Sequence, residues 1–492
     1  MSQDHIVAAE RRLRTGAGGL DEILHGGLIP HRLYLVDGDP GSGKTTLALQ
    51  YLLEGAAQGE KCLYVTLSET REELLAGAQS HGWDLQGVEI IELTADSTDL
   101  DISTQLTMYP PSEVELNDTT RRVLEIVERV NPTRLVFDSL SELRLLAQSS
   151  LRYRRQILAL KQFFIGRQCT VLLLDDRTSE GSDLQLQSLA HGVLTLEQLA
   201  PLYGAERRRL RVIKFRGASF RGGFHDFKIN RGGLQVFPRL VAAEHTATFE
   251  RGPLASGVSE LDALLGGGPD RGTSTLFMGP AGSGKSTLAT HYAAAAAARG
   301  ERAVLFAFEE SELTLRARAG ALGINLAPAG NGRVSIRQID PAQVSPGEFS
   351  YQVRAAVERD NATVIVIDSL NGYMNAMPEE RFLLIQLHEL QTYLGRQGVT
   401  TLMVVAQHGL LGNEWHGAID ASYLADSVVL IRYFELEGTL RRAISVLKKR
   451  SGKHEETIRE LQFNSHGIQL SDPLAQLYGV LAGAPTTQRA AL

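Results

Sequence analysis

Residues 38–45 read GDPGSGKT, and residues 279–286 repeat the pattern as GPAGSGKS. Both stretches fit the phosphate-binding motif G-x-x-x-x-G-K-[ST], and each lies between a short apolar run and a helix-forming run. The glycines let successive backbone N–H groups converge on phosphate oxygens, and the following helix adds the positive end of its dipole. A glycine-rich turn without a ligand is the alternative, and two copies in the same setting argue against it. The sequence therefore predicts two nucleotide sites.

The motif also predicts which residues bind the nucleotide. In the first copy these are Gly38, Gly41, Ser42, Gly43, Lys44, Thr45 and Thr46. In the second copy they are Gly279, Gly282, Ser283, Gly284, Lys285, Ser286 and Thr287. Each lysine would neutralise the β- and γ-phosphates, while the hydroxyl groups of Thr45 and Ser286 would hold Mg²⁺. The expected cofactors are therefore ATP and Mg²⁺.

The repetition extends beyond the two loops. Lys44 and Lys285 are 241 positions apart, and Glu69 and Glu310 keep the same interval. Further along the chain the interval between matching residues shortens to 230 and 234 positions, so loops of the two copies differ in length. A duplicated domain accounts for this pattern better than chance does.

Short apolar runs alternate with helix-forming runs in both copies, as in strands that a parallel sheet buries on both faces. The runs are 33–36, 62–67, 135–137 and 171–174 in the first copy, and 275–278, 303–308, 364–367 and 401–405 in the second. The predicted fold class is α/β, with two tandem RecA-like P-loop NTPase domains. Each is a mainly parallel, doubly wound sheet with its ligand at the carboxyl ends of the strands. The predicted parts are a first domain 1–245, a second domain 246–475 and a short C-terminal tail 476–492.

Composition limits the class of protein. The 492 residues suit two domains, and 43% apolar with 22% charged residues is ordinary for a globular chain. No run reaches the roughly 20 apolar residues that cross a bilayer, and residues 1–14 lack the apolar core of a signal peptide. Cys62 and Cys169 lie in apolar runs, which argues against disulfides and cysteine zinc sites. With a net charge of −7, the sequence predicts a cytoplasmic protein without membrane or nucleic-acid partners.

Carboxylates follow the apolar runs where a nucleotide site needs them. Asp138 and Asp368 end their runs and are each followed by Ser-Leu, which predicts metal-binding carboxylates beside the loops. A turn or cap residue is the alternative. Glu309 and Glu310 follow an apolar run of the second copy, and Glu69 occupies the matching place in the first. Such carboxylates suit a general base, and capping of a helix start is the alternative for Glu69 and Glu310.

The chain resembles the KaiC family of tandem RecA-like ATPases, which includes the cyanobacterial clock protein, over roughly residues 12–486. The marks of the resemblance are a Thr-Gly-x-x-x-Leu-Asp segment, the two loops, the Glu309-Glu310-Ser311 triplet, and the basic stretches 206–217 and 438–460. The resemblance implies a homohexamer with ATP held between subunits. It also implies cations that reach the γ-phosphate of the neighbouring subunit, namely Lys214, Arg216, Lys448 and Arg450. A solvated basic strand edge is the alternative.

The sequence departs from the family at several positions. Ser68 replaces the first glutamate of the pair in the first copy, and Phe220 replaces a histidine that helps to hold the nucleotide. Ser422-Tyr423 stands where clock proteins have a phosphorylated Ser-Thr pair, so Ser422 is the candidate phosphoacceptor. The loop and tail that recruit KaiA have no counterpart, so a KaiA-type activator is not expected. The acidic connection 96–118 leaves a KaiB-like partner open.

Together these features predict a KaiC-like hexameric ring that binds and hydrolyses ATP. The resemblance adds serine/threonine autokinase activity in the second domain and a role in timing or signal transduction. One alternative is a nucleotide-switched scaffold with little turnover, which Ser68 favours for the first ring. A RecA- or RadA-type DNA-dependent ATPase and a hexameric helicase share the core, but this acidic chain lacks zinc-finger cysteines.

Overall fold

The computed structural model describes residues 12–93, 111–147, 149–177, 184–201, 204–326, 333–375, 382–407, 423–465, 467–483 and 485–487. The chain divides into two compact units, Met1–Arg239 and Leu240–Leu492. This division lies a few residues before the expected boundary at 245, and Leu240 and Ala242 pack into a core of the second unit.

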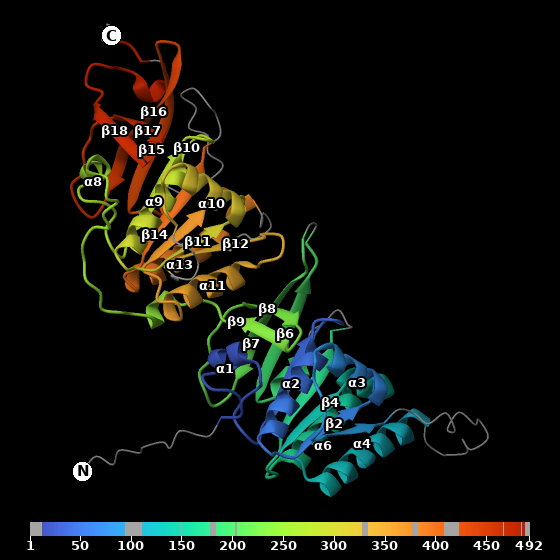
Figure 1. Cartoon of the computed structure of the whole chain (residues 1–492). Helices are drawn as coiled ribbons and strands as arrows, with labels where there is room; N and C mark the ends of the chain where they lie inside the picture. The colour runs from blue at the N-terminus through green and yellow to red at the C-terminus, as the bar shows by residue number, and fades with distance from the viewer. Residues whose placement is uncertain are drawn as a thin grey trace, which may run out of the picture. The chain divides into compact units, whose positions relative to one another are not determined.

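The described part of the first unit forms a nine-stranded sheet in the order β3-β2-β4-β5-β1-β6-β7-β8-β9 (Figure 1). The strands are β1 (Leu33–Gly38), β2 (Cys62–Thr66), β3 (Val88–Glu92), β4 (Arg134–Asp138), β5 (Thr170–Asp176), β6 (Gly192–Leu199), β7 (Arg207–Phe215), β8 (His225–Asn230) and β9 (Gly233–Phe237). The first six strands in the sheet order are parallel, and β7, β8 and β9 extend the sheet as antiparallel strands. The helices are α1 (Gly18–Ile23), α2 (Lys44–Ala57), α3 (Arg71–Ser80), α4 (Pro111–Val130), α5 (Leu140–Ala147), α6 (Ser150–Phe164) and α7 (Leu184–Leu189).

The described part of the second unit repeats this topology in the order β12-β11-β13-β14-β10-β15-β16-β17-β18. Its strands are β10 (Ser274–Gly279), β11 (Ala303–Ala307), β12 (Val334–Gln338), β13 (Val364–Asp368), β14 (Thr400–Ala406), β15 (Ser427–Leu436), β16 (Thr439–Lys449), β17 (Arg459–Asn464) and β18 (Gly467–Pro473). Its helices are α8 (Ser259–Leu264), α9 (Lys285–Ala298), α10 (Glu312–Ala321), α11 (Pro346–Glu358), α12 (Leu370–Asn375) and α13 (Leu383–Arg396). Two short 3₁₀ helices, η2 (Ala242–Glu244) and η4 (Val480–Ala482), precede and follow these elements.

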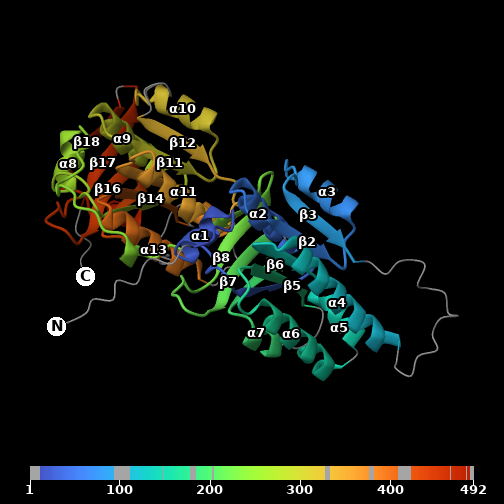
Figure 2. The same ribbon diagram turned by 90° about the horizontal axis from the view of Figure 1, so that it is seen from below.

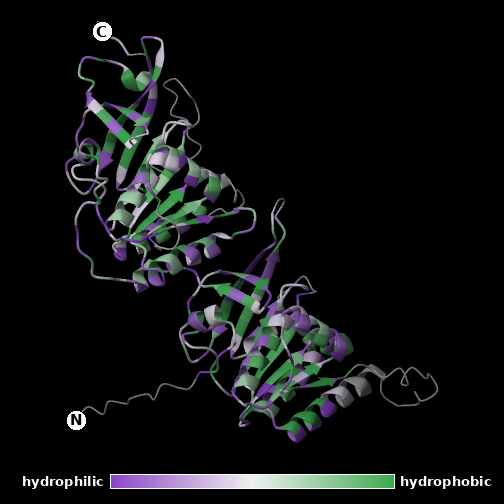
Figure 3. Cartoon of the chain, viewed as in Figure 1, coloured by the Kyte–Doolittle hydropathy of each residue, from purple (hydrophilic) through white to green (hydrophobic). Residues whose placement is uncertain are grey.

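Helices cover both faces of each sheet (Figure 2). In the first unit α1, α2 and α3 pack on one face and α4, α5, α6 and α7 on the other. In the second unit α8, α9 and α10 face α11, α12 and α13 across the sheet. Alternate side chains of a buried strand point to opposite faces, so Val36 joins one core cluster and Leu35 the other. Figure 3 shows the resulting apolar interior of each unit. Among the described residues, no helix has the length and apolar character needed to cross a membrane.

The predicted α/β class and the mainly parallel, doubly wound sheets are confirmed, since each predicted apolar run forms the body of a strand. The antiparallel strands at one edge were not predicted, because charged residues interrupt their apolar pattern: β7, for example, reads RRRLRVIKF. The interpretation of 96–118 as one continuous connection is wrong, since α4 begins at Pro111. Proline suits the first turn of a helix, where its missing N–H group would have no partner in any case.

Candidate nucleotide-binding sites

Each phosphate loop lies between the central strand of its sheet and the helix that follows. In the first domain β1 ends at Gly38 and α2 begins at Lys44, and in the second β10 ends at Gly279 and α9 begins at Lys285. β1 is bordered by β5 and β6, and β10 by β14 and β15. Both loops therefore open at the carboxyl ends of parallel strands, where doubly wound sheets bind ligands.

Steric constraints explain the glycines of the loops. Gly43 and Gly284 precede their helices with φ angles of 101° and 102°, which residues other than glycine rarely adopt. A Cβ atom on Gly38 would lie 2.4 Å from a carbonyl oxygen of β6, and one on Gly279 would lie 2.3 Å from a carbonyl oxygen of β15. The backbone can thus turn tightly enough to surround a phosphate group with N–H donors.

The two loop lysines are buried, and their ammonium groups donate hydrogen bonds to backbone carbonyl oxygens of their own loops. Lys285 Nζ donates to the carbonyl oxygen of Pro280 at 2.7 Å, and burial lowers the pKa of this lysine. No carboxylate forms an ion pair with Lys285 among the residues that the structure describes. Lys44 Nζ donates to two loop carbonyls at 2.9 and 3.0 Å and pairs with Asp176 at 2.7 Å. A buried ammonium group among carbonyl acceptors fits an anionic ligand such as a polyphosphate.

The carboxylates predicted to bind Mg²⁺ lie beside the loop hydroxyls. Thr45 Oγ1 donates to Asp138 Oδ2 at 3.5 Å, and the hydroxyl of Tyr64 donates to the same oxygen. Ser286 hydrogen-bonds Asp368 in the second domain. Burial raises the pKa of both carboxyl groups, and a divalent cation would favour their charged forms. Each hydroxyl–carboxylate pair is therefore a suitable oxygen donor set for Mg²⁺.

The adjacent glutamates of the second domain have different partners. Ser369 Oγ donates to Glu309 Oε1 at 2.7 Å. Glu310 is instead held by both arms of Arg318, with Nε–Oε1 and Nη2–Oε2 distances of 3.1 and 2.7 Å. Arg318 Nη1 also donates to Thr287 Oγ1 at 2.9 Å. The two candidate bases are thus chemically distinct, although they are neighbours in the sequence.

The first domain has one glutamate at this place. Burial, and then the nearby Asp138 carboxyl, raises the pKa of Glu69. Ser68 occupies the position of Glu309, and the effect is visible on Ser139, the counterpart of Ser369. Ser139 Oγ is buried without a hydrogen-bond partner among the described residues. The serine substitution therefore removes both a carboxylate and the acceptor for a buried hydroxyl.

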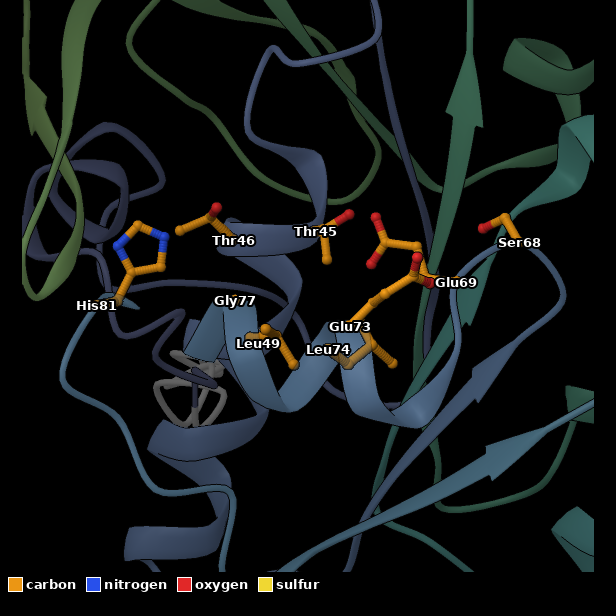
Figure 4. Close-up of a pocket in the computed structure, with 9 residues that line it drawn as sticks. All are labelled: Thr45, Thr46, Leu49, Ser68, Glu69, Glu73, Leu74, Gly77 and His81. Carbon is orange, nitrogen blue, oxygen red and sulfur yellow. The ribbon is translucent and has the colours of Figure 1, made fainter. Parts of the chain in front are cut away.

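A pocket lies beside Glu69 in the first domain (Figure 4). Its volume is about 370 Å³, and it is lined by Thr45, Thr46, Leu49, Ser68, Glu69, Glu73, Leu74, Gly77 and His81. Glu69 and Glu73 gather near Thr45 at one end, while His81 lies near Thr46 at the other. The pocket thus borders both the loop helix α2 and the candidate base.

Sequence reasoning missed two residues of these sites, Arg318 and Asp176, because neither belongs to a motif. The repeat interval of 241 sets Gly77 at the position of Arg318, within the matching helix. Asp176 ends β5, and the strand register places Ala406 at the matching position of β14. A comparison of the two copies position by position would have found both differences.

The cations of the first domain that are expected to act in trans lie away from their own loop. Lys214 on β7 pairs with Val193 on β6, and Val193 in turn pairs with Leu35 on β1. Leu35 lies three residues before the end of β1, so Lys214 does not reach the level of the loop. Lys214 donates to backbone oxygens of α7, and Arg216 Nη2 donates to the carbonyl oxygen of Ser188 at 3.1 Å.

The second domain repeats this placement. Lys448 on β16 is level with Val428, which is level with Leu276 on β10, again three residues before the loop. Lys448 Nζ donates to the carbonyl oxygen of Ala425 at 2.8 Å, and Arg450 Nη1 lies 3.6 Å from an Asp426 carboxylate oxygen. These four cations face the amino ends of the strands next to their own loop strands.

Some predicted features cannot be placed. Ser422 and residues 96–110 lie outside the described residues, whereas Tyr423 is described and about half exposed. Phe220, which replaces the histidine of the family, packs against a core cluster of the first domain.

Comparison with known proteins identifies the family. The sequence model of the KaiC ATPase matches residues 13–241 and 254–475. The circadian clock oscillator protein KaiC of Acaryochloris marina is 26% identical over 488 residues, which cover 96% of this chain and 91% of the relative. The circadian clock protein KaiC3 of Synechocystis is 27% identical over 489 residues, which cover 96% of this chain and 94% of the relative. The matched ranges include both phosphate loops. The chain therefore belongs to the KaiC family of ATPases.

Proposed function

We propose that both domains bind and hydrolyse ATP, and that the chain assembles as a homohexamer with ATP between its subunits. The ATP sites are supported mainly by the buried ammonium group of Lys285, which donates to a carbonyl oxygen of the loop and forms no ion pair with a carboxylate among the described residues. The triphosphate of ATP would add a direct counter-charge to those of Asp368 and Glu309, which act on Lys285 without an ion pair to it among the described residues. Membership of an ATPase family supports the same conclusion.

The residues of each site have distinct roles in the proposed hydrolysis of ATP. The loop N–H groups and the loop lysine fix the phosphates, so that the γ-phosphoryl group is oriented for attack. Thr45 and Asp138 in the first domain, and Ser286 and Asp368 in the second, would hold Mg²⁺, which would neutralise charge on the phosphates. A glutamate beside the loop accepts the proton of the attacking water.

The strand register supports the trans-acting cations. Three residues of strand span about 10 Å, so Lys214 and Lys448 lie well below the loops of their own domains. A subunit whose cations cannot reach its own ATP can offer them to the site of a neighbour. Cations of this kind are worth about 10³–10⁵ in rate where they contact the transferred phosphoryl group.

Two lysine substitutions test the sites. Lys44→Ala and Lys285→Ala should each remove one bound nucleotide per chain, since no nearby group duplicates the charge. Native mass spectrometry with ATP and Mg²⁺ measures the stoichiometry and the subunit number together, and exposed Lys453→Ala is the matched control. Two nucleotides per chain in both variants would contradict the sites. A stable monomer at saturating ATP would remove the trans-acting roles.

We also propose serine autokinase activity in the second domain, with Ser422 as acceptor and Glu309 as base. The hydrogen bond from Ser369 supports the choice of Glu309, because it orients the carboxylate beside the loop. Tyr423 offers a longer, rigid phenol in place of the threonine of the family. Peptide mass mapping after incubation with ATP and Mg²⁺ should find phosphate on Ser422, and the phosphate should disappear in Glu309→Gln. Phosphate on Tyr423 would overturn the assignment.

A nucleotide-switched scaffold is the second candidate for the first domain. It is favoured by Ser68 and by the hydroxyl of Ser139, which has no hydrogen-bond partner in the part of the chain that the structure describes. Turnover of the Lys285→Ala variant separates the two, because only the first domain then binds ATP. Since the named relatives are circadian clock proteins, we further propose a cytoplasmic role in timing or signal transduction, with a KaiB-like protein as candidate partner. Strong stimulation of turnover by single-stranded DNA would contradict this reading.

A further inference from the structure

Arg318 forms a three-point contact in the second nucleotide site. Its guanidinium group meets both oxygens of Glu310, at 3.1 and 2.7 Å, and donates to the hydroxyl of Thr287 at 2.9 Å. Arg318 and Glu310 are each about a quarter exposed, so the pair is partly shielded from water. Thr287 belongs to the first turn of the loop helix α9, so the contact ties Glu310 to the phosphate loop.

This contact makes Glu310 a poor proton acceptor. A forked arginine occupies both carboxylate oxygens at once, so neither oxygen is free to accept a hydrogen bond from the attacking water in the same plane. Glu309 is different, because the one hydrogen bond that its carboxylate accepts in the described part of the chain comes from the hydroxyl of Ser369, on Oε1. Of the two adjacent glutamates, Glu309 is therefore the better base.

The first domain lacks the arginine. Gly77 takes the position of Arg318, while Thr46 and Glu69 take those of Thr287 and Glu310. A Cβ atom added to Gly77 would meet no atom within 4 Å, and the pocket of about 370 Å³ opens beside it (Figure 4). In the described part of the first domain the Glu69 carboxylate forms no ion pair, and the nearby Lys44 acts on it less strongly than the surrounding carboxylates do.

We propose that Arg318 is a positioning residue that withdraws Glu310 from proton transfer, so that the two domains take their base from different places. The second domain uses the first glutamate of the pair, Glu309. The first domain uses Glu69, the counterpart of the second glutamate. This inference rests on the proposed hydrolysis of ATP in both domains.

The reaction balances in the same way in both sites. A water oxygen forms a bond to the γ-phosphorus as the bond from that phosphorus to the β,γ-bridging oxygen breaks. ADP leaves with the electron pair of the broken bond, and the proton lost by the water passes to the carboxylate of Glu309 or Glu69. The step needs no oxidant and no further co-reactant.

A suppressor experiment in the second domain tests the role of Arg318. In a Lys44→Ala background, Glu309→Gln should lower kcat by about 10²–10⁴. Adding Arg318→Gly, which copies the first domain, should restore at least a tenth of the lost kcat because Glu310 becomes available. Arg318→Lys should restore less, since it keeps a cation beside Glu310. A further Glu310→Gln should abolish the restored activity, and KM for ATP should stay within about twofold throughout, as expected for a group that acts on the proton transfer step.

The reciprocal exchange tests the first domain. In a Lys285→Ala background, Gly77→Arg should lower kcat at least tenfold with little change in KM, because the new guanidinium group can reach Glu69 as Arg318 reaches Glu310. Gly77→Gln is the matched control, since it fills the same space without charge and should retain most of the turnover. Equal losses in the arginine and glutamine variants would show that filling the pocket causes the effect, and would overturn the proposal.

The outcomes separate this inference from the proposed function. If neither Glu309→Gln nor Glu69→Gln changes turnover in its own domain, the assignment of bases fails, whatever Arg318 does. If both lower turnover but Arg318→Gly restores none in a protein that still binds ATP in the second domain, the assignment of bases stands and the role of Arg318 is refuted.

Discussion

The two loop lysines, Lys44 and Lys285, bear the same charge in different surroundings. Lys44 pairs with Asp176 at 2.7 Å, whereas the strand register gives the second domain Ala406 at that position. ATP entering the first site must displace this carboxylate from the lysine, and it then meets an additional negative charge near its phosphates. In the second site no ion pair to Lys285 has to be broken among the described residues, although Asp368 and Glu309 place negative charge near the lysine there as well. The loops themselves therefore predict that both domains bind ATP, but not that they bind it equally.

Asp176→Ala should tighten ATP binding to the first domain by about 2–5-fold, the range expected for a partly exposed ion pair of up to about 1 kcal/mol. The measurement is an ATP titration of the Lys285→Ala background by calorimetry, so that one site is observed. Asp176→Asn is the control that keeps the size of the side chain, and it should give a similar gain. Weaker binding in both variants would show instead that Asp176 supports the bound nucleotide.

At the residue scale, the sequence predicts best where the backbone geometry demands a fixed residue type. A phosphate loop needs glycine at positions with positive φ or with no room for Cβ, so the motif identifies Gly43 and Gly284 from the letters alone. Arg318 and Asp176 obey no such rule. Their effect depends on which side chain they meet across the fold, and that information appears only in the contacts.

Among secondary-structure elements, β4 is anchored by a buried arginine that has no equivalent in β13. Arg134 is fully buried; it pairs with Glu60, donates to the carbonyl oxygens of Arg14 and Tyr51, and lies over the ring of Tyr51. Gly55 makes room for it, because a Cβ atom there would lie 2.5 Å from the arginine side chain. The side chain of Arg134 thus connects β4 to α2 and to the segment before α1.

Arg134→Met should destabilise the first unit by about 3–5 kcal/mol, because it removes one partner of a largely buried ion pair. Urea unfolding followed separately for each unit measures this, and the transition of the second unit should not move. The double variant Arg134→Met, Glu60→Leu should recover at least half of the loss, since an apolar pair of similar volume removes the charge. A double variant as unstable as the single one would show that the backbone contacts of Arg134 dominate.

His225, the first residue of β8, makes the first unit sensitive to acid. Its Nε2 donates to the carbonyl oxygen of Arg221, its Nδ1 accepts from the N–H group of Arg239, and the ring is buried. Burial, with the nearby arginine charges, lowers its pKa from 6.5 to about 4. A lowered histidine pKa means that the unfolded chain takes up a proton first, so this contribution to stability is present above pH 6.5 and is lost as the pH falls toward 4.

The predicted loss is on the order of 3 kcal/mol between pH 7 and pH 4. The free energy of unfolding of the first unit should therefore decline through this window, and His225→Gln should flatten the decline, because an amide does not titrate. Urea midpoints at several pH values, compared between the two proteins, measure the difference. Parallel pH profiles for wild type and His225→Gln would refute the role of this histidine.

How far the elements could be predicted depends on their burial. Strands β1, β2, β4 and β5 are buried along their length and read as apolar runs, so the sequence predicts them. The parallel strands β3 and β6 and the order of the strands in the sheet were not predicted. Strand β7 is only partly buried and its charges follow no simple alternation, so the antiparallel edge was not predicted. Helix α4 was missed in part because an acidic, Ser/Thr-rich sequence favours loops by composition alone.

For the whole molecule, the repeated topology gives each domain both a nucleotide loop and a pair of cations directed elsewhere. A mixing experiment tests whether these cations act in trans. One chain carries Arg450→Ala and the other carries Lys285→Ala, and Glu69→Gln in both silences the first domain. Each chain alone should lose about 10³ or more of the turnover of the second domain. Rings mixed from equal amounts of the two chains should regain about a quarter of the wild-type turnover of the second domain. In such rings about a quarter of the interfaces join an intact loop to an intact arginine.

The expected recovery depends on the mixing of chains, so the matched control is each variant assembled separately and combined under conditions that prevent exchange. No recovery in fully exchanged rings would show that Arg450 serves its own chain or none. The sequence alone suggested the trans arrangement through a family resemblance, and the strand register adds a physical reason for it.

The antiparallel pairing of β6 with β7 has a consequence for communication along such a ring. β6 is hydrogen-bonded to β1, which leads into the loop, and β7, which carries Lys214, is hydrogen-bonded to β6. A shift of the loop on nucleotide exchange can therefore move the cations two strands away as one rigid ladder. If those cations contact the ATP of the next subunit, hydrolysis at one site can change the geometry of a neighbouring site that still holds ATP. In the proposed hexamer, six such contacts would form a closed cycle, and the timing of hydrolysis around it would depend on the delay at each contact as much as on the rate of any single site.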